Sequence, residues 1–318
     1  MRVIAIEEHF WTPGVRAATA SYRPGGGRPD TLAKLDDLGE GRLADMDAAG
    51  IDVQVLSVNA PAAQELDAAE AVPLARDAND RLAAAVAAHP DRFAGFATLP
   101  TADPAAAAAE LDRAVTGLGF KGAMIHGHTR GRFLDDPAYL PIFERAAALD
   151  VPIYLHPTFP TPPVIQAYYG GFDAPVSGVL ATAGWGWHAE TGLHALRLVL
   201  GGVFDRFPAL RVIIGHMGEN IPFSLARADE RLSPVATHLK RRVGEYFQEN
   251  FYITTSGYFT DPPLLCALMV LGADRIMFSV DYPFSDNAAG RAFLDRAPIS
   301  AADRERIAHG NAERLLRM

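Results

Sequence analysis

The residues Val3-Ile4-Ala5-Ile6-Glu7-Glu8-His9 begin the pattern that decides the fold: a short apolar run, rich in β-branched residues, that ends in charged and imidazole side chains. Similar runs recur along the chain, and longer stretches rich in alanine and leucine separate them. This alternation is typical of repeated β/α units. Strands that are apolar on both faces are expected where helices cover one face and a packed interior fills the other.

Eight strands are predicted from these runs: Val3–His9, Val53–Val58, Phe93–Leu99, Phe120–His126, Pro152–His156, Arg211–His216, Phe251–Ser256 and Arg275–Asp281. The helices predicted between them include Glu70–His89, Pro104–Leu118, Tyr139–Leu149, Leu193–Leu200, Pro262–Leu271 and Ala301–Arg317. Eight such units favour an α/β fold of the (β/α)8 type, the TIM barrel. We expect residues 1–318 to form one such domain, with long loops at about 13–39 and 157–191.

The composition excludes several classes of partner. The 318 residues carry 29 Lys and Arg against 38 Asp and Glu, a net charge of −9, which argues against binding a nucleic-acid backbone. A single cysteine, Cys266, allows no internal disulfide, and no apolar run approaches the roughly 20 residues of a membrane helix. The N-terminus turns acidic at Glu7, too early for a signal peptide. We therefore predict a cytoplasmic protein without a nucleic-acid or membrane partner.

A run of three glycines, Gly25-Gly26-Gly27, raises the possibility of a phosphate-binding loop. No Gly-Lys-Ser/Thr sequence follows it, and no helix is obvious after it. We predict a flexible loop there.

Four side chains at the ends of predicted strands form a candidate metal site, because active sites of such barrels lie at the carboxyl ends of the strands. Glu7 and His9 share one face of the first strand, since strand side chains alternate, although a solvated strand end is an alternative. His156 ends the fifth strand, where a core histidine bonded to the backbone is the alternative. Asp281 follows the apolar run of the eighth strand, where a free buried carboxylate would be costly. Two imidazoles and two carboxylates suit one divalent ion, Zn²⁺ or Mn²⁺.

A further histidine and carboxylate follow the sixth strand in Gly215-His216-Met217-Gly218-Glu219. The two glycines permit a tight turn that would bring Glu219 back to His216, fixing the tautomer of the imidazole and raising its basicity. The alternative is a helix N-terminus with a glutamate in its first turn.

These motifs resemble those of the amidohydrolase superfamily, and within it the metal-dependent, non-oxidative aromatic acid decarboxylases. The resemblance rests on Glu7-Glu8-His9, His156-Pro157, Gly215-His216-Met217-Gly218-Glu219, Ser279-Val280-Asp281-Tyr282-Pro283-Phe284 and Gly310-Asn311-Ala312-Glu313-Arg314-Leu315-Leu316. The branch includes the γ-resorcylate, 2,3-dihydroxybenzoate and 5-carboxyvanillate decarboxylases, with aminocarboxymuconate semialdehyde decarboxylase more distant.

The resemblance implies a distorted barrel that binds one metal through Glu7, His9, His156 and Asp281, needs no organic cofactor and assembles as a homodimer or homotetramer. It also implies that Asp281, His216 and Glu219 are catalytic. The expected reaction is loss of CO2 from a hydroxylated benzoate or a similar unsaturated carboxylic acid. Asp281 is the candidate proton donor to the ring, and His216, supported by Glu219, holds the substrate or relays the proton.

Three further residues are candidate substrate contacts. His126 stands where resorcylate-type enzymes tend to have an asparagine near the substrate, and with His128 it either contacts substrate or belongs to a polar loop. Arg227 matches a position that in similar enzymes reaches the neighbouring subunit's pocket, and a surface arginine is the alternative. Phe284 offers a wall for ring stacking or is ordinary core material.

Two other functions stay open on the sequence. The same scaffold supports hydrolysis of a lactone, ester or amide by a metal-activated water, and fold analogy does not exclude this. A catalytically silent barrel that binds a metal or ligand is the second alternative, although all four candidate ligands are intact.

Overall fold

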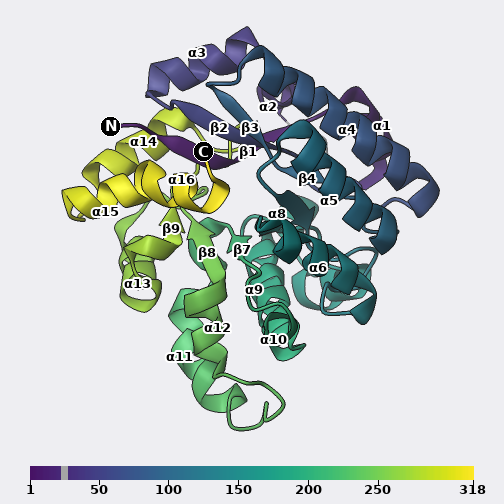
Figure 1. Cartoon of the computed structure of the whole chain (residues 1–318), viewed down its shortest axis with the longest axis vertical. Helices are drawn as coiled ribbons and strands as arrows, with labels where there is room; N and C mark the ends of the chain where they lie inside the picture. The colour runs from purple at the N-terminus through teal and green to yellow at the C-terminus, as the bar shows by residue number, and fades with distance from the viewer. Residues whose placement is uncertain (23–27) are drawn as a thin grey trace.

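A ring of parallel strands surrounded by helices forms the centre of the computed structural model, which describes residues 1–22 and 28–318 (Figure 1). The described strands are β1 (Ile4–Phe10), β2 (Val53–Val58), β3 (Phe93–Gly95), β4 (Ala97–Thr98), β5 (Ala123–His126), β6 (Ile153–His156), β7 (Val212–Ile214), β8 (Phe251–Thr254) and β9 (Ile276–Met277). They pair in the orders β1-β2-β3 and β4-β5-β6-β7-β8-β9, always in parallel. This arrangement confirms the predicted α/β barrel fold.

The barrel is distorted where the ladders break. The predicted strand Phe93–Leu99 is two short strands, because Phe96 N–H donates to Leu56 O whereas Ala97 N–H donates to Gly122 O of the next unit. Strand β9 is shorter than predicted, because Phe278 N–H donates to Ile307 O rather than to a neighbouring strand.

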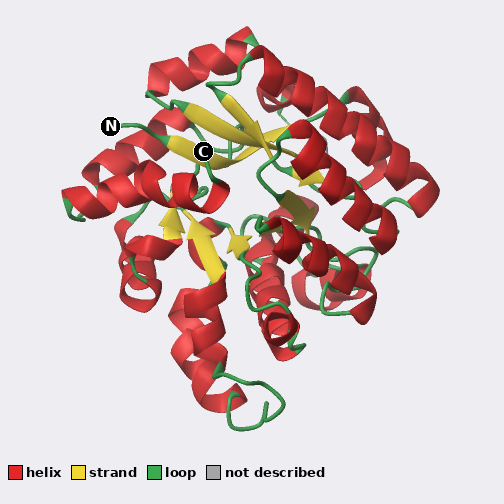
Figure 2. Ribbon diagram, viewed as in Figure 1, coloured by secondary structure: helices red, strands yellow, loops and turns green. Residues whose placement is uncertain are grey.

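Helices cover the outside of the ring (Figure 2). They are α1 (Pro13–Ala18), α2 (Pro29–Asp36), α3 (Glu40–Ala49), α4 (Ala68–Ala88), α5 (Pro104–Leu118), α6 (Leu140–Leu149), α7 (Pro162–Val164), α8 (Ala174–Ala181), α9 (Gly186–Leu200), α10 (Val203–Arg206), α11 (Ile221–Leu232), α12 (Val243–Asn250), α13 (Asp261–Leu271), α14 (Asn287–Arg296), α15 (Ala301–Glu305) and α16 (Asn311–Leu316). Helix α5 shows why the bounds fall where they do. The Asp103 carboxylate caps the N–H groups of Ala105 and Ala106, Pro104 occupies the first turn, and Gly119 ends the helix at φ +74°.

The segments predicted as long loops contain helices. The segment 13–39 holds α1 and α2, each of which begins with a proline in its first turn, and Thr12 Oγ1 caps α1 by accepting from Val15 N–H. The triple glycine at 25–27 lies outside the described residues. The segment 157–191 holds α7, α8 and the start of α9, which begins at Gly186 and not at the predicted Leu193. The predicted helix Ala301–Arg317 is interrupted by a π-helical turn at Arg306–Gly310.

The interior of the barrel is a small apolar cluster, separate from the larger core between strands and helices. It contains Ile4, Ile6, Val53, Val55, Ala94, Phe96, Met124, Tyr154, Ile213, Tyr252 and Met277, with Ala312 and Leu316 of α16. Helix α16 therefore covers one end of the interior, and the polar residues that follow on the same strands lie towards the other end. No helix in the described residues is long and apolar enough to span a membrane.

Candidate metal centre

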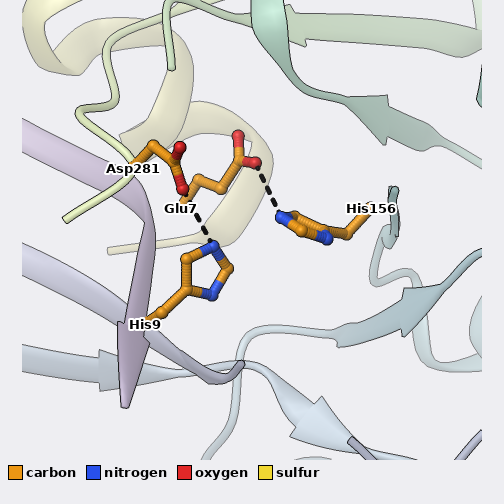
Figure 3. Close-up of side chains that lie close together, drawn as sticks. All are labelled: Glu7, His9, His156 and Asp281. Atoms are coloured by element: carbon orange, nitrogen blue, oxygen red, sulfur yellow. Dashed lines mark ion pairs between the residues drawn. The ribbon is translucent and has the colours of Figure 1, made fainter. Parts of the chain in front are cut away.

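The four predicted ligands converge at the carboxyl ends of the strands (Figure 3). Their ligand atoms all lie within 4.8 Å of one another. Glu7 Oε1 lies 3.3 Å from His156 Nε2, and His9 Nε2 lies 3.3 Å from Asp281 Oδ1. Three of the side chains are buried, and Asp281 is 18% exposed. The structure thus brings together residues of β1, β6 and the loop after β9, which are far apart in sequence.

This donor set fits a divalent cation. Glu7 Oε1 and His9 Nε2 are buried, and neither atom has a hydrogen-bond partner within the described part of the chain. Such buried unpaired atoms are costly unless another group satisfies them. Burial raises the pKa of Glu7, with the charge of His216 acting in the opposite direction. A cation among these atoms would satisfy both and keep Glu7 ionised.

Glu7 points into the site because the chain bulges there. The β1–β2 register shifts between Ala5 and Glu8, which adds one residue to β1. Its other oxygen, Oε2, accepts hydrogen bonds from the hydroxyls of Tyr154, Thr254 and Ser256. Three donors therefore fix the carboxylate and leave Oε1 facing the other ligands.

Gly215 is required beneath this carboxylate. A Cβ atom at that position would lie 2.8 Å from Glu7 Oε2 and 2.9 Å from Oε1, closer than real contacts allow. The sequence interpretation assigned the glycine to a turn, and the structure adds a close approach to Glu7.

Glu8 points away from the cluster, as the alternation of strand side chains predicted. Its carboxylate accepts from Ser279 Oγ and from the N–H groups of Val280 and Tyr282, each at 2.9 Å. Burial raises the pKa of Glu8 to about 8. Glu8 therefore ties β1 to the loop that carries Asp281, which holds the two parts of the cluster in register.

His126 contacts His156 through Nδ1, the ring nitrogen that does not face Glu7. Its Nε2 lies 2.8 Å from Val58 O, so this nitrogen carries a hydrogen, and burial lowers its pKa to about 3, which keeps the ring neutral. Its Nδ1 is then an acceptor, 3.0 Å from His156 Nδ1, which also lies 2.8 Å from Pro157 O. His156 Nδ1 must therefore be the donor. The lone pair of His156 Nε2 consequently faces Glu7.

A second group beside the cluster contains a residue that the sequence analysis missed. Glu219 accepts from His216 Nδ1 through one oxygen and from His188 Nδ1 through the other, both at 2.7 Å. The other ring nitrogen of His188, Nε2, lies 3.1 Å from Ala183 O, so the ring is held on both sides. His188 lies in the first turn of α9, where the sequence predicted a loop, and the cluster Trp185-Gly186-Trp187-His188 was the available signal.

The turn that carries His216 is strained. His216, Met217, Glu219 and Asn220 all have φ between +49° and +65°. Burial acts to lower the pKa of His216, but the charges of Glu219 and Glu7 outweigh it and raise the pKa well above its ordinary value. His216 Nε2 lies 3.8 Å from Glu7 Oε1 and 3.9 Å from Asp281 Oδ2. It therefore faces the four candidate ligands Glu7, His9, His156 and Asp281, called the metal group below.

A cavity of about 780 Å³ lies beside the four clustered residues, and two of its lining side chains adjoin them. Phe284, which is 45% exposed, contributes to its lining, and its ring centre lies 6.0 Å from that of His9. Trp187 also lines it, 6.4 Å from the ring of His156. His128 lies apart from the four ligands, where its Nδ1 accepts from Gly131 N–H.

Arg227 is not part of this site within the single chain. It lies on α11, which projects away from the barrel (Figure 1), its side chain is 66% exposed, and it pairs with Glu230 at 3.0 Å.

A parallel β/α barrel with imidazoles and carboxylates gathered at its strand ends defines a class of metal-site barrel proteins. The amidohydrolase family model matches residues 4–318, and the chain belongs to this family.

Relatives of known name match almost the whole chain. The γ-resorcylate decarboxylase of Polaromonas sp. strain JS666 is 42% identical over 99% of this chain and 98% of its own length. A crystal structure of dihydroxybenzoic acid decarboxylase from the same strain, with bound manganese and the inhibitor 2-nitroresorcinol, is 42% identical, with a TM-score of 0.92 over 99% of this chain and 97% of that one. The 5-carboxyvanillate decarboxylase of Sphingomonas paucimobilis is 38% identical, with a TM-score of 0.92 over 100% of this chain and 99% of that one.

Proposed function

We propose that this chain is a metal-dependent, non-oxidative decarboxylase of a hydroxybenzoate. The observation that carries the proposal is the convergence of Glu7, His9, His156 and Asp281 beside an aromatic-walled cavity, in a chain whose relatives are named decarboxylases. Metal-dependent hydrolysis of a lactone, ester or amide is not favoured, because the named γ-resorcylate and 5-carboxyvanillate decarboxylases that match nearly the whole chain are carboxy-lyases.

The four clustered side chains would hold one divalent ion, Mn²⁺ or Zn²⁺. When bound, the ion supplies positive charge that orients the substrate's carboxylate and neighbouring oxygen. The protein's contribution is rigidity. Three hydroxyl donors fix Glu7, Glu8 holds the Asp281 loop, and His126 and Pro157 O together fix the ring of His156.

Asp281 delivers a proton to the ring carbon that bears the carboxylate. Burial acts to raise its pKa, but the neighbouring rings of His216 and His9 outweigh this and lower it, so Asp281 enters as a carboxylate. It first accepts a proton and then passes it to the ring carbon. The electrons of the broken carbon–carbon bond return to the ring, and CO2 leaves. The sum is one proton consumed, one aryl C–H bond formed and one CO2 released.

His216 supplies or stores that proton. Its Nε2 faces Asp281, and Glu219 on the opposite ring nitrogen stabilises the protonated ring. His188 holds the second oxygen of Glu219 and so keeps the carboxylate aimed at His216. We assign His188 and Glu219 as positioning residues for His216.

The remaining predictions concern the surroundings of the site. Phe284 and Trp187 form walls against which the ring packs. His126 influences the substrate only through His156, because both its ring nitrogens are engaged. Four further expectations stay predictions. They are contact between Arg227 and a neighbouring subunit's pocket, homodimeric or homotetrameric assembly, a cytoplasmic location and a single-domain organisation.

The test is CO2 release by metal-free protein reloaded with Mn²⁺ or Zn²⁺, run on hydroxylated benzoates beside a panel of lactones, esters and amides. We expect about one bound ion per chain, measured by mass spectrometry, and CO2 from at least one hydroxybenzoate. Bound metal with hydrolysis and no CO2 would replace the proposal with the hydrolase function. A protein that binds no metal under any loading condition would overturn the ligand assignment.

A further inference from the structure

The cavity beside the metal group is larger than a single aromatic ring requires. Its volume is about 780 Å³. A cavity of about 150 Å³ is sufficient to bind benzene, and pockets of about 300–1,000 Å³ accommodate drug-sized ligands. A hydroxybenzoate ring placed against the metal group would therefore leave most of the cavity unfilled.

The inner part of the cavity adjoins the site. Trp11 follows His9 by two residues, and with Asn59, Phe284 and Trp187 it lines the region next to the clustered residues. The carboxylate and hydroxyl groups of a substrate must lie here to reach Asp281. Its other substituents must point outward.

The outer part of the cavity is mainly apolar. It runs between α1 and α2 and is lined there by Pro13, Ala17, Ala20, Leu32 and Leu35. Among the described lining residues the charged ones are Arg16 and Asp36, which pair with each other at 2.5 Å. Their charges offset each other, so the described part of the lining offers no net charge to a second carboxylate. A polar substituent in this region would lose hydration free energy. An apolar substituent would instead gain free energy from being buried.

We propose that the substrate is a hydroxybenzoate with an unbranched alkyl chain of several carbons, which lies in the outer cavity between α1 and α2. The inference rests on the proposed decarboxylase function and specifies its substrate class. Each buried methylene is expected to raise kcat/KM about fourfold. Full burial of a five-carbon chain then corresponds to as much as about 1,000-fold, and we take about tenfold as the minimum.

The first experiment compares 2,4-dihydroxybenzoates that carry hydrogen, methyl, propyl or pentyl at carbon 6, with the Mn²⁺-loaded protein and CO2 release as the readout. It is paired with a binding measurement that needs no turnover. Resorcinol and 5-pentylresorcinol are titrated into the protein while its tryptophan fluorescence is followed, since two of the three tryptophans, Trp11 and Trp187, line the cavity. We expect kcat/KM to rise along the series and 5-pentylresorcinol to bind more than about tenfold more tightly than resorcinol.

A matched pair of variants locates the effect. Leu32→Asn removes apolar surface from the outer cavity, whereas Leu265→Asn makes the same change at a leucine that is 41% exposed on α13, outside the lining. Leu32→Asn is expected to lower the pentyl-to-hydrogen ratio of kcat/KM at least about fourfold. Leu265→Asn should leave that ratio unchanged.

The outcomes separate this inference from the proposed function. CO2 from the unsubstituted acid without any gain on lengthening overturns the alkyl substrate and leaves the decarboxylase function standing. No CO2 from any member, with tight binding of 5-pentylresorcinol that Leu32→Asn weakens, overturns the decarboxylase function and retains the ligand class. Equal binding of resorcinol and 5-pentylresorcinol overturns the inference whatever the turnover.

Discussion

His126→Asn tests how the protein holds His156 in the orientation that we propose for metal binding. The substitution removes the imidazole that lies 2.8 Å from Val58 O and 3.0 Å from His156 Nδ1. Asparagine is shorter and cannot span both partners. His156 then loses the neighbour that fixes its ring from behind, while its Nδ1 keeps Pro157 O at 2.8 Å.

The expected loss of metal affinity depends on the remaining hydrogen bond from His156 Nδ1 to Pro157 O. Loss of an outer partner of a metal-ligating histidine typically weakens metal binding about 10- to 100-fold. Because Pro157 O still fixes the tautomer, we expect the lower end, about tenfold, which corresponds to about 1.4 kcal/mol.

The assay is titration of metal-free protein with Mn²⁺ in competition with a chelating dye. The control is His194→Asn, which alters another buried histidine whose Nε2 accepts from Leu134 N–H and does not contact the ligands. Thermal unfolding of both variants confirms that they fold. An unchanged Mn²⁺ affinity in His126→Asn, or equal weakening in both variants, would refute the positioning role.

Three further predictions concern turnover, pH and packing. His216→Ala should retain Mn²⁺ but lower kcat at least about 100-fold, whereas Asp281→Ala should lower both Mn²⁺ binding and kcat. Metal analysis and CO2 assays on each variant measure these two quantities. Normal turnover in either variant removes that residue from the mechanism. Burial lowers the pKa of His194 to about 3, whereas in the unfolded chain the pKa of a histidine is about 6.5. The neutral, buried His194 therefore contributes fully to stability above about pH 6.5, and this contribution is lost as the pH falls towards 3. The loss at pH 5 is about 2 kcal/mol, and denaturant titrations at about pH 7 and pH 5 should show His194→Gln losing that much less than the unsubstituted protein; equal losses contradict it. Phe204→Ala removes a ring whose centre lies 5.1 Å from that of Phe251 and should lower the unfolding free energy by about 3–5 kcal/mol, and an unchanged urea midpoint would count against this packing.

The clustering of the four candidate ligands was predictable because their signal is local. Glu7, His9, His156 and Asp281 each follow a short apolar run, and parallel strands place their carboxyl ends at one end of a barrel. The alternation of side chains also separated Glu7 and His9 from Glu8 correctly. It did so even though β1 contains a bulge that no pattern indicated.

The supports of the site were not predictable, because they depend on contacts between distant segments. Tyr154 on β6, Thr254 on β8 and Ser256 just after β8 reach Glu7, and nothing in their own neighbourhoods indicates that partner. His188 was missed because α9 begins at Gly186, in a stretch whose glycine and tryptophan residues do not favour a helix. The position of His126 behind His156 likewise depends on the pairing of β5 with β6.

Turnover in D2O tests the central claim most directly. The Mn²⁺-loaded protein is incubated with a hydroxybenzoate that it converts, and the product is examined by proton NMR and mass spectrometry. The account predicts CO2 and a phenol with one deuterium at the ring carbon that bore the carboxylate, formed by the unsubstituted protein and not by Asp281→Asn. Product formation by Asp281→Asn at the unsubstituted rate, or a product that retains its carboxylate, would contradict it.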